Sequence, residues 1–377
     1  MQRYIHCLRL ASCAGIVLTM VLVGPRGARA SEAGAAPQPS LNGVVVRPHL
    51  DTQANPTPPQ IHLPNANITR LLTSQELEVP RHLRLLVFAP HPDDETLAAG
   101  GLIQRVLATD GQVRVVFVTN GDGYVDGVRR EVQRAHTSTA DFIQYGEQRH
   151  QEALQALTHL GVTETNGLFL GFPDDGIDDL WAGHWSTSKP YTSPYTRFDR
   201  PEYKESLSRQ VEYAGTNLKN EITRTLRDFR PDWVLLPDPR DRHPDHCTTG
   251  VFVLDALRQL RADGQTHFKH TQALTYLVHY PDYPASPAWV REIAGAGVGG
   301  SATAGRALSA ARWLNLPLAP SELARKREAM GEYHSQVLVM QPFLKQFLGS
   351  SELFGRLDAS QVETVPHEYA LRFRRRQ

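Results

Sequence analysis

Two short stretches of the chain carry residues that can bind a metal ion and transfer protons. One is the pentapeptide HPDDE at residues 91–95, and the other is HPDH at residues 243–246. His91 and Asp94 are three residues apart at an expected strand-to-helix junction, so both side chains fall on one side of the first helical turn. His246 would join them from another helix. Two histidines and one carboxylate make a three-ligand zinc site with an open fourth position, which is the arrangement of a catalytic zinc.

The residues beside these ligands suit the hydrolysis of an amide. Asp93 is placed to take a proton from water as a general base. His243 could stabilise the developing oxyanion and protonate the leaving amine, with Asp245 orienting its ring, as carboxylates commonly orient imidazoles. Either stretch alone could instead be a capped helix start. Because both stretches follow apolar strands in one chain, we expect metal-assisted amide hydrolysis.

The elements that must hold these residues alternate between strand and helix. Apolar runs predict strands at residues 83–88, 113–119, 168–170, 233–236 and 273–280. Helices are expected at residues 96–108, 148–160, 206–229, 245–260 and 320–330. This alternation predicts an α/β fold with a mostly parallel sheet and helices on both faces. Right-handed crossovers would bring the strand ends, with His91, Asp122, Asp174 and His243, to one edge of the sheet.

Two longer segments interrupt this pattern, and both leave from expected strand ends. Residues 124–146 are polar and mixed, whereas residues 181–203 are rich in tyrosine and tryptophan. The aromatic side chains of the second segment could stack on the faces of a sugar, or they could pack the loop against the domain. After residue 280 the strand pattern fades, so we expect a C-terminal extension from about residue 281, with a solvated basic tail at residues 372–376.

The first 30 residues have the layout of a secretory signal peptide. Arg3 and Arg9 precede an apolar run at residues 10–23, and a small-x-small cleavage motif follows at residues 28–30. The run is shorter than the roughly 20 apolar residues that span a membrane. We therefore expect export to the periplasm or the cell exterior, with no membrane span in the mature chain. An uncleaved N-terminal membrane anchor is the alternative.

The expected domain order is a signal peptide at residues 1–30, an extended linker or arm at residues 31–81, and one α/β domain at residues 82–377. The signal peptide holds four arginines and no acid. The mature chain is therefore slightly acidic, and neither nucleic acid nor an anionic membrane is an expected partner. Cys247 remains as a single cysteine, which excludes an intrachain disulfide. We interpret it as a small buried side chain.

Between about residues 83 and 280, with an echo at residues 326–336, the chain resembles the PIG-L/LmbE-like family of zinc-dependent N-acetylglucosaminyl deacetylases. The residues that carry the resemblance are 90–95, 100–101, 119–122, 149–161, 169–174 and 243–246. Some members carry a tyrosine two residues before the first histidine of the second motif, near the oxyanion. This chain has Asp241 there, and the segment at 181–203 is a candidate source of a tyrosine.

The resemblance implies a Rossmann-like fold and a set of site residues. It implies zinc, or alternatively Fe²⁺, on His91, Asp94 and His246. It also implies Asp93 as the general base and His243 as the group that stabilises the oxyanion. Arg149 and Asp174 are implied to hold substrate hydroxyls.

The expected activity is removal of acetyl from an N-acetylglucosamine-containing sugar or glycoconjugate. A metal-dependent amidase or esterase acting on a non-sugar substrate is one alternative. A non-catalytic glycan-binding protein on the same fold is another, although it would have no need of Asp93 and His243. The sequence leaves the oligomeric state open.

Overall fold

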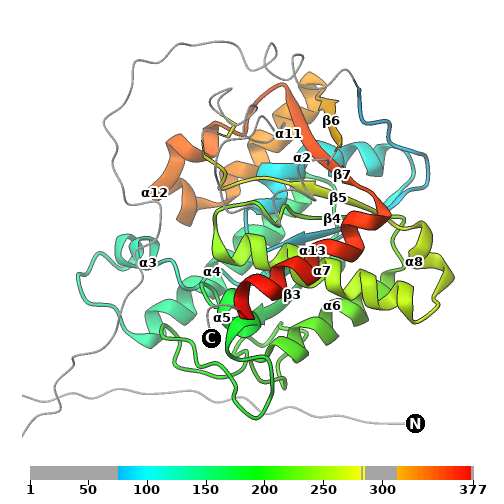
Figure 1. The fold of residues 1–377 in the computed structure, drawn as a ribbon. Helices are drawn as coiled ribbons and strands as arrows, with labels where there is room; N and C mark the ends of the chain where they lie inside the picture. The colour runs from blue at the N-terminus through cyan, green and yellow to red at the C-terminus, as the bar shows by residue number, and fades with distance from the viewer. Residues whose placement is uncertain (1–74, 282, 285–311, 375–377) are drawn as a thin grey trace, which may run out of the picture. The chain divides into compact units, whose positions relative to one another are not determined.

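The computed structural model describes residues 75–281, 283–284 and 312–374. Their centre is a seven-stranded sheet with the strand order β3-β2-β1-β4-β5-β7-β6 (Figure 1). In chain order the strands are β1 (Arg84–Ala89), β2 (Gln112–Thr119), β3 (Gly167–Phe172), β4 (Trp233–Pro237), β5 (Gln272–Tyr276), β6 (Arg312–Pro317) and β7 (Ser351–Leu357). Strands β1 to β5 are parallel to one another, whereas β7 is antiparallel to both β5 and β6. The expected mostly parallel α/β sheet is confirmed.

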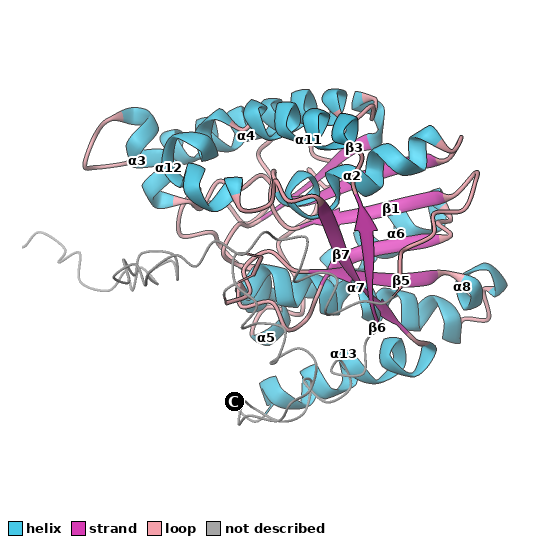
Figure 2. Cartoon of the chain, turned by 90° about the horizontal axis from the view of Figure 1, so that it is seen from above, coloured by secondary structure: helices cyan, strands magenta, loops and turns pink. Residues whose placement is uncertain are grey.

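Helices cover both faces of this sheet. They are α2 (Asp94–Ala108), α3 (Val125–Val132), α4 (Thr139–His159), α5 (Ile177–Ala182), α6 (Gly215–Phe229), α7 (Pro244–Ala262), α8 (Thr266–His270), α11 (Pro320–Glu332), α12 (His334–Lys345) and α13 (Ala359–Arg374). Figure 2 shows α4 and α11 on one side of the strands, with α7 and α13 on the other. Along β1, Leu85 and Val87 pack into one core, while Leu86 and Phe88 pack into the opposite one. Side chains that alternate between faces in this way need helices on both.

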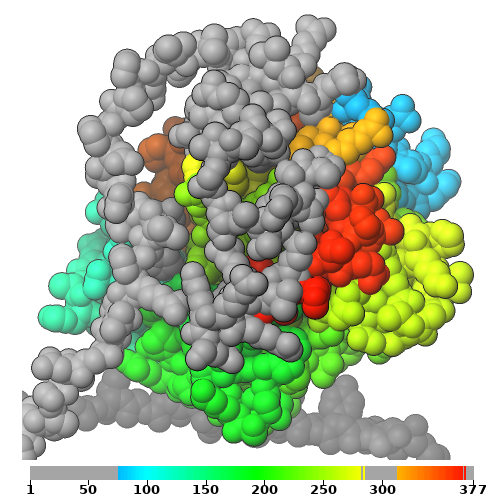
Figure 3. Space-filling view, in the orientation of Figure 1, coloured from blue at the N-terminus to red at the C-terminus, as the bar shows by residue number. Residues whose placement is uncertain are grey.

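Residues beyond 281 complete the sheet, which corrects the expectation that the strand pattern ends near residue 280. Strands β6 and β7 pair along their whole length, with Leu314 opposite Phe354. Charged residues such as Arg312 and Glu352 interrupt their apolar pattern, and this hid them in the sequence. Residues 372–374 of the expected basic tail belong to α13, a helix that packs on α7, and the rest of that tail lies outside the described residues. Figure 3 shows this C-terminal segment in red beside the yellow-green residues of α7 and α8.

Three expected element boundaries are wrong. Helix α4 begins at residue 139 rather than 148, because Ser138 and Asp141 form a capping box that starts it earlier. Helix α6 begins at residue 215 rather than 206, because the backbone of Tyr213 pairs with Tyr191 and Asp199 instead of a helical turn. Strand β5 ends at residue 276 rather than 280.

The N-terminal expectations fall mostly outside the described residues. This applies to the signal peptide and to residues 31–74 of the expected linker. The last part of that linker lies against the edge of the sheet, where Leu77 is buried and its amide donates to the carbonyl of Asn315 in β6 at 2.8 Å. Among the helices that the structure describes, none is both long and apolar enough to cross a membrane.

Candidate active site

Both motifs follow parallel strands that lie side by side. Residues 90–93 connect β1 to α2, which begins at Asp94, and His243 is the N-cap of α7, which begins at Pro244. Strand β1 pairs with β4. In the sheet, β2 and β3 follow outward from β1, whereas β5 follows outward from β4 in the opposite direction. Ligands of open α/β sheets bind where the strand order reverses in this way. The fold therefore places both motifs at one expected binding edge.

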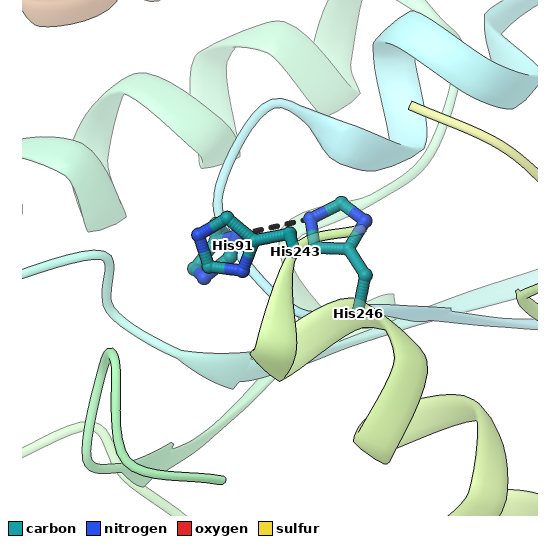
Figure 4. Close-up of side chains that lie close together, drawn as sticks. All are labelled: His91, His243 and His246. Carbon is teal, nitrogen blue, oxygen red and sulfur yellow. Dashed lines mark hydrogen bonds between the residues drawn. The ribbon is translucent and has the colours of Figure 1, made fainter. Parts of the chain in front are cut away.

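The three expected metal ligands converge on one point. His91 Nδ1 lies 3.3 Å from Asp94 Oδ2, His246 Nε2 lies 3.2 Å from the same oxygen, and the two nitrogens are 3.3 Å apart. Figure 4 shows the rings of His91 and His246 close together, with His243 beside them. Ligand atoms about 2.1 Å from a tetrahedral zinc ion are roughly 3.4 Å from one another. The spacing of these donors therefore fits one zinc ion.

The donor set is shielded from solvent, with exposed fractions of 7% for His91, 1% for Asp94 and 0% for His246. Asp94 Oδ1 has no hydrogen-bond partner among the described residues, although buried carboxylate oxygens normally have one. Burial raises the pKa of Asp94, but the charge of His246 and the hydrogen bonds from both histidines lower it further, to well below its usual value. This low pKa favours the ionised carboxylate, which is the form that binds a metal ion.

Asp93 occupies the N-cap position of α2 but does not cap the helix with its side chain. Its Oδ2 atom lies 3.3 Å from Arg149 Nη2 instead. Burial raises the pKa of Asp93 to about 8, against the charge of Arg149, which lowers it. The backbone of Asp93 has a φ of 121°, a conformation that costs a non-glycine residue on the order of 1–3 kcal/mol. The Asp93 carboxylate thus makes no capping hydrogen bond and lies near the expected ligands Asp94 and His91.

His243 lies against the ligand histidines, with its ring centroid 4.9 Å from that of His91 and 5.2 Å from that of His246. Burial and the neighbouring imidazoles lower the pKa of His243 well below its usual value. Its Nδ1 accepts a hydrogen bond from the amide of Asp245 at 3.3 Å. A neutral imidazole that accepts at Nδ1 carries its proton on Nε2, which is then the donor.

The structure corrects the expected role of Asp245. Its carboxylate does not orient His243 but accepts from the amides of Asp175 at 2.7 Å and Ile177 at 3.0 Å, and it lies 3.3 Å from His91 Nε2. The first turn of α7 directs this carboxylate toward the loop after β3, so only the backbone of Asp245 reaches the His243 ring. The ring that the Asp245 carboxylate contacts is that of an expected metal ligand, His91.

Arg149 and Asp174 were expected to hold substrate hydroxyls. Arg149 is buried and donates to the carbonyls of Gly121 at 2.9 Å and Pro92 at 2.6 Å. Asp174 Oδ1 lies 3.1 Å from His91 Nε2. Both side chains therefore hold parts of the site itself, and their contact with a substrate stays a prediction.

Residues 86–257 match the profile of a family described as PIG-L, GlcNAc-PI de-N-acetylase. This segment is a PIG-L family domain. It contains all the residues that the sequence predicted as metal ligands, catalytic groups or substrate contacts.

Relatives of the PIG-L segment include enzymes that act on acetylated sugars. The chain is 35% identical over 169 residues to the 1D-myo-inositol 2-acetamido-2-deoxy-alpha-D-glucopyranoside deacetylase of Mycobacterium sp. (strain KMS). This match covers 44% of this chain and 47% of that protein. The chain is 26% identical over 177 residues to the diacetylchitobiose deacetylase of Thermococcus kodakarensis, which covers 46% and 49%. The chain spans about half the length of the curated relatives it matches.

Among solved structures, the N,N'-diacetylchitobiose deacetylase from Pyrococcus horikoshii matches with 18% identity and a TM-score of 0.42. This match covers 72% of the present chain and 83% of the other. A likeness at this level bears on no individual residue of the PIG-L site.

The structure adds two residues to the PIG-L site that sequence reasoning missed. Asp241 accepts from the amides of His243 and His279, both at 3.0 Å, and lies 3.7 Å from His246 Nδ1. The His279 ring lies 4.8 Å from that of His246 and 5.1 Å from that of His243. Asp241 stands two residues before the second motif, and this position in the sequence could have identified it as a site residue. His279 belongs to no motif and reaches the site only because β5 lies next to β4.

Tyrosines within residues 181–203 pack this loop against the rest of the domain. This favours a structural role for these side chains over stacking on a sugar. Tyr195 is buried and donates to Asp175 at 2.8 Å. Tyr203 is buried and donates to Asp122 at 2.5 Å. These hydroxyls tie the insertion to the loops after β2 and β3.

Proposed function

We propose that the chain is a metal-dependent N-deacetylase that removes acetyl from an N-acetylglucosamine-containing sugar or glycoconjugate. The observation that carries this proposal is the convergence of Asp94 Oδ2, His91 Nδ1 and His246 Nε2 within 3.2–3.3 Å, with Asp93 and His243 beside them. The PIG-L family description and the names of the relatives support the acetylated sugar as substrate.

The metal that we propose is zinc, with Fe²⁺ as the alternative. Two imidazoles and one carboxylate suit both ions. A zinc ion held by His91, Asp94 and His246 would supply Lewis acidity, which polarises an amide carbonyl and lets water lose a proton near pH 7.

The residues around the ligands divide the proton transfers between them. In our proposal Asp93 takes a proton from the attacking water, whose oxygen bonds to the acetyl carbon. The Nε2 proton of His243 stabilises the negative charge that forms on the acetyl oxygen. The carbon–nitrogen bond then breaks as the amine nitrogen takes the proton that Asp93 received from water. Asp93 is ionised again, and the products are acetic acid, which ionises to acetate, and the free amino sugar. Asp245 and Asp174 keep the His91 ring in place during these steps.

We also propose that the protein acts outside the cytoplasm. The support is the sequence of residues 1–30, with its arginines, apolar run and cleavage motif. N-terminal sequencing of the secreted or periplasmic protein tests this proposal, since cleavage should follow Ala30. An N-terminus at Met1 on membrane-bound protein would instead identify an anchor.

The decisive experiment measures acetate release from a panel of N-acetylglucosamine monosaccharides, oligosaccharides and glycolipids. The zinc-loaded chain is compared with Asp93→Asn and with Asp255→Asn, a buried acid of α7 that pairs with Lys219 outside the site. We expect Asp93→Asn to keep its zinc and lose about 10²–10⁴-fold in kcat, with Asp255→Asn near the parent. Acetate from no sugar, with zinc bound, would direct the search to non-sugar amides. A zinc-bound Asp93→Asn with the parental rate would remove Asp93 as the base.

A further inference from the structure

The backbone of Asp93 needs support from its surroundings. Its φ of 121° and ψ of −31° lie outside the regions that a residue with a side chain adopts readily. A strained residue of this kind persists only where neighbouring contacts over-determine its conformation. The contacts that hold Asp93 are therefore part of how the site works.

One contact comes from within the motif itself. The amide of Asp93 donates to Glu95 Oε2 at 3.2 Å, and Glu95 is fully buried. Glu95 thereby satisfies the amide of the N-cap residue, while the Asp93 carboxylate makes no capping hydrogen bond. This leaves the Asp93 carboxylate available to the site.

Glu95 is held in turn from the C-terminal part of the chain. The hydroxyl of Tyr333, at the junction of α11 and α12, donates to Glu95 Oε1, and so does the hydroxyl of Thr96. Tyr333 has an exposed fraction of 0%. No other described residue donates a side-chain hydrogen bond to the Glu95 carboxylate.

The same turn also fixes the helix that carries Arg149. Ser335 donates to the carboxylate of Glu152 in α4 through both its amide and its hydroxyl, at 2.9 and 2.6 Å. Gln336 donates to the hydroxyl of Tyr145, also in α4, at 2.8 Å. Residues 333–336 therefore contact both elements that hold Asp93. Glu95 accepts from the Asp93 amide, and α4 carries Arg149, which pairs with the Asp93 carboxylate.

We infer that Tyr333, acting through Glu95, is a positioning residue that keeps the Asp93 backbone in its unusual conformation and so aims the general base. This inference rests on the proposed function for the role of Asp93. Tyr333 does not touch the reacting atoms. Its effect should therefore appear in the rate of the chemical step and not in metal binding.

The test is Tyr333→Phe, which removes one hydroxyl and keeps the ring. We expect kcat to fall about 10²-fold because a small misplacement of a reacting group has that effect. KM should stay within about twofold of the parent, which is the signature of an interaction that acts only in the transition state. The zinc content should be unchanged. The matched control is Tyr213→Phe, another buried tyrosine, whose hydroxyl donates to the Gly171 carbonyl at 3.0 Å.

The two tyrosine variants separate positioning from lost stability. The inference is supported if both variants shift Tm by the same amount but only Tyr333→Phe loses kcat. A parental kcat in Tyr333→Phe, or the same kcat loss in Tyr213→Phe, overturns it. If Tyr333→Phe does not fold, Glu95→Gln takes its place with the same expected loss of kcat, and a parental rate there overturns the inference equally.

A crystal structure of Tyr333→Phe gives a readout that does not depend on turnover. We expect the φ of Asp93 to leave the region near 121°, and an unchanged backbone would contradict the inference. If the parent releases acetate from no substrate, the proposed function fails, but this structural comparison still decides whether Tyr333 positions Asp93.

Discussion

Nε2 of His246 lies 3.2 Å from Oδ2 of Asp94, although Asp94 opens α2 and His246 belongs to the first turn of α7. The pairing of β1 with β4 is what brings these two helix starts together. Neither motif can form the site alone, because each supplies only part of the ligand set. Metal binding should therefore depend on the pairing of β1 with β4.

The ligand set can be tested by zinc content. The structure also groups His91, His243 and His246 as possible donors within 4.8 Å of one another, so the two histidines of the second motif need separate tests. We expect His246→Ala to lose zinc and His243→Ala to keep about one zinc per chain while losing turnover. Atomic absorption on both purified variants is the measurement. Zinc lost from His243→Ala but kept by His246→Ala would reverse their roles.

Metal removal should lower thermal stability. A ligand that binds only the folded state stabilises it by about 2.7 kcal/mol at 100 times its Kd. In a domain of this size that corresponds to roughly 5 °C in Tm. We expect this drop when a chelator is added to the parent, measured by calorimetry, and no drop for His246→Ala. Equal melting of the parent with and without chelator would argue against metal binding at these residues.

The buried ion pair of Lys326 and Glu352 should be important for stability. Lys326 Nζ donates to Glu352 Oε1 at 2.7 Å, and the Glu352 carboxylate accepts from the amides of Gly101 and Leu102 in α2. Removing one partner of a buried pair costs about 3–5 kcal/mol. We expect that loss for Lys326→Met in urea unfolding, with partial recovery in the double variant Lys326→Met/Glu352→Gln.

The control for this pair lies on the surface of α3. Arg129 pairs with Asp126 at 3.6 Å, and both side chains are exposed. Arg129→Met should change the free energy of unfolding by less than about 1 kcal/mol. A loss in Lys326→Met no larger than this would show that the buried pair adds little.

Asp122 should make stability depend on pH. Burial and the charge of Asp174 raise the pKa of Asp122 to about 7, against the hydrogen bond from Tyr203, which lowers it. The unfolded value is about 3.9. Between these values the folded chain binds more protons than the unfolded chain, so the contribution of Asp122 to stability falls as the pH rises through this window.

An amide at this position removes the titration and still accepts from Tyr203. Relative to the parent, Asp122→Asn should therefore become more stable as the pH rises from 5 to 8. Urea unfolding of both proteins at the two pH values measures the difference. A difference that stays constant, or that moves the other way, would contradict the raised pKa.

Local signals explain what could be predicted from the sequence. The motifs at residues 91–95 and 243–246 follow apolar strands, and both the parallel sheet and the convergence of His91, Asp94 and His246 follow from that order. The start of α4 was predicted too late, because the capping box at residue 138 lies inside a polar segment that seemed to be a loop.

Long-range contacts explain what could not be predicted. His279 reaches the site through strand order, and the carboxylate of Asp245 turns to His91 because of the loop after β3. Tyr333 meets Glu95 across 238 residues of sequence. No spacing within a motif encodes contacts of this kind, which depend on how helices and loops pack once the sheet has formed.

Residues 333–336 contact the site but lie beyond residues 86–257, the segment that matches the family. The part of the chain needed for a stable fold is therefore longer than the matched segment. A fragment ending at residue 257 would keep all the proposed ligands and the base. It would nevertheless lack the hydroxyl that reaches Glu95, and it would be cut before β5, leaving β4 as an open edge. An unprotected, apolar edge strand is a template for pairing with other chains. Such a fragment should therefore aggregate during expression, and a soluble version has to extend at least through β7.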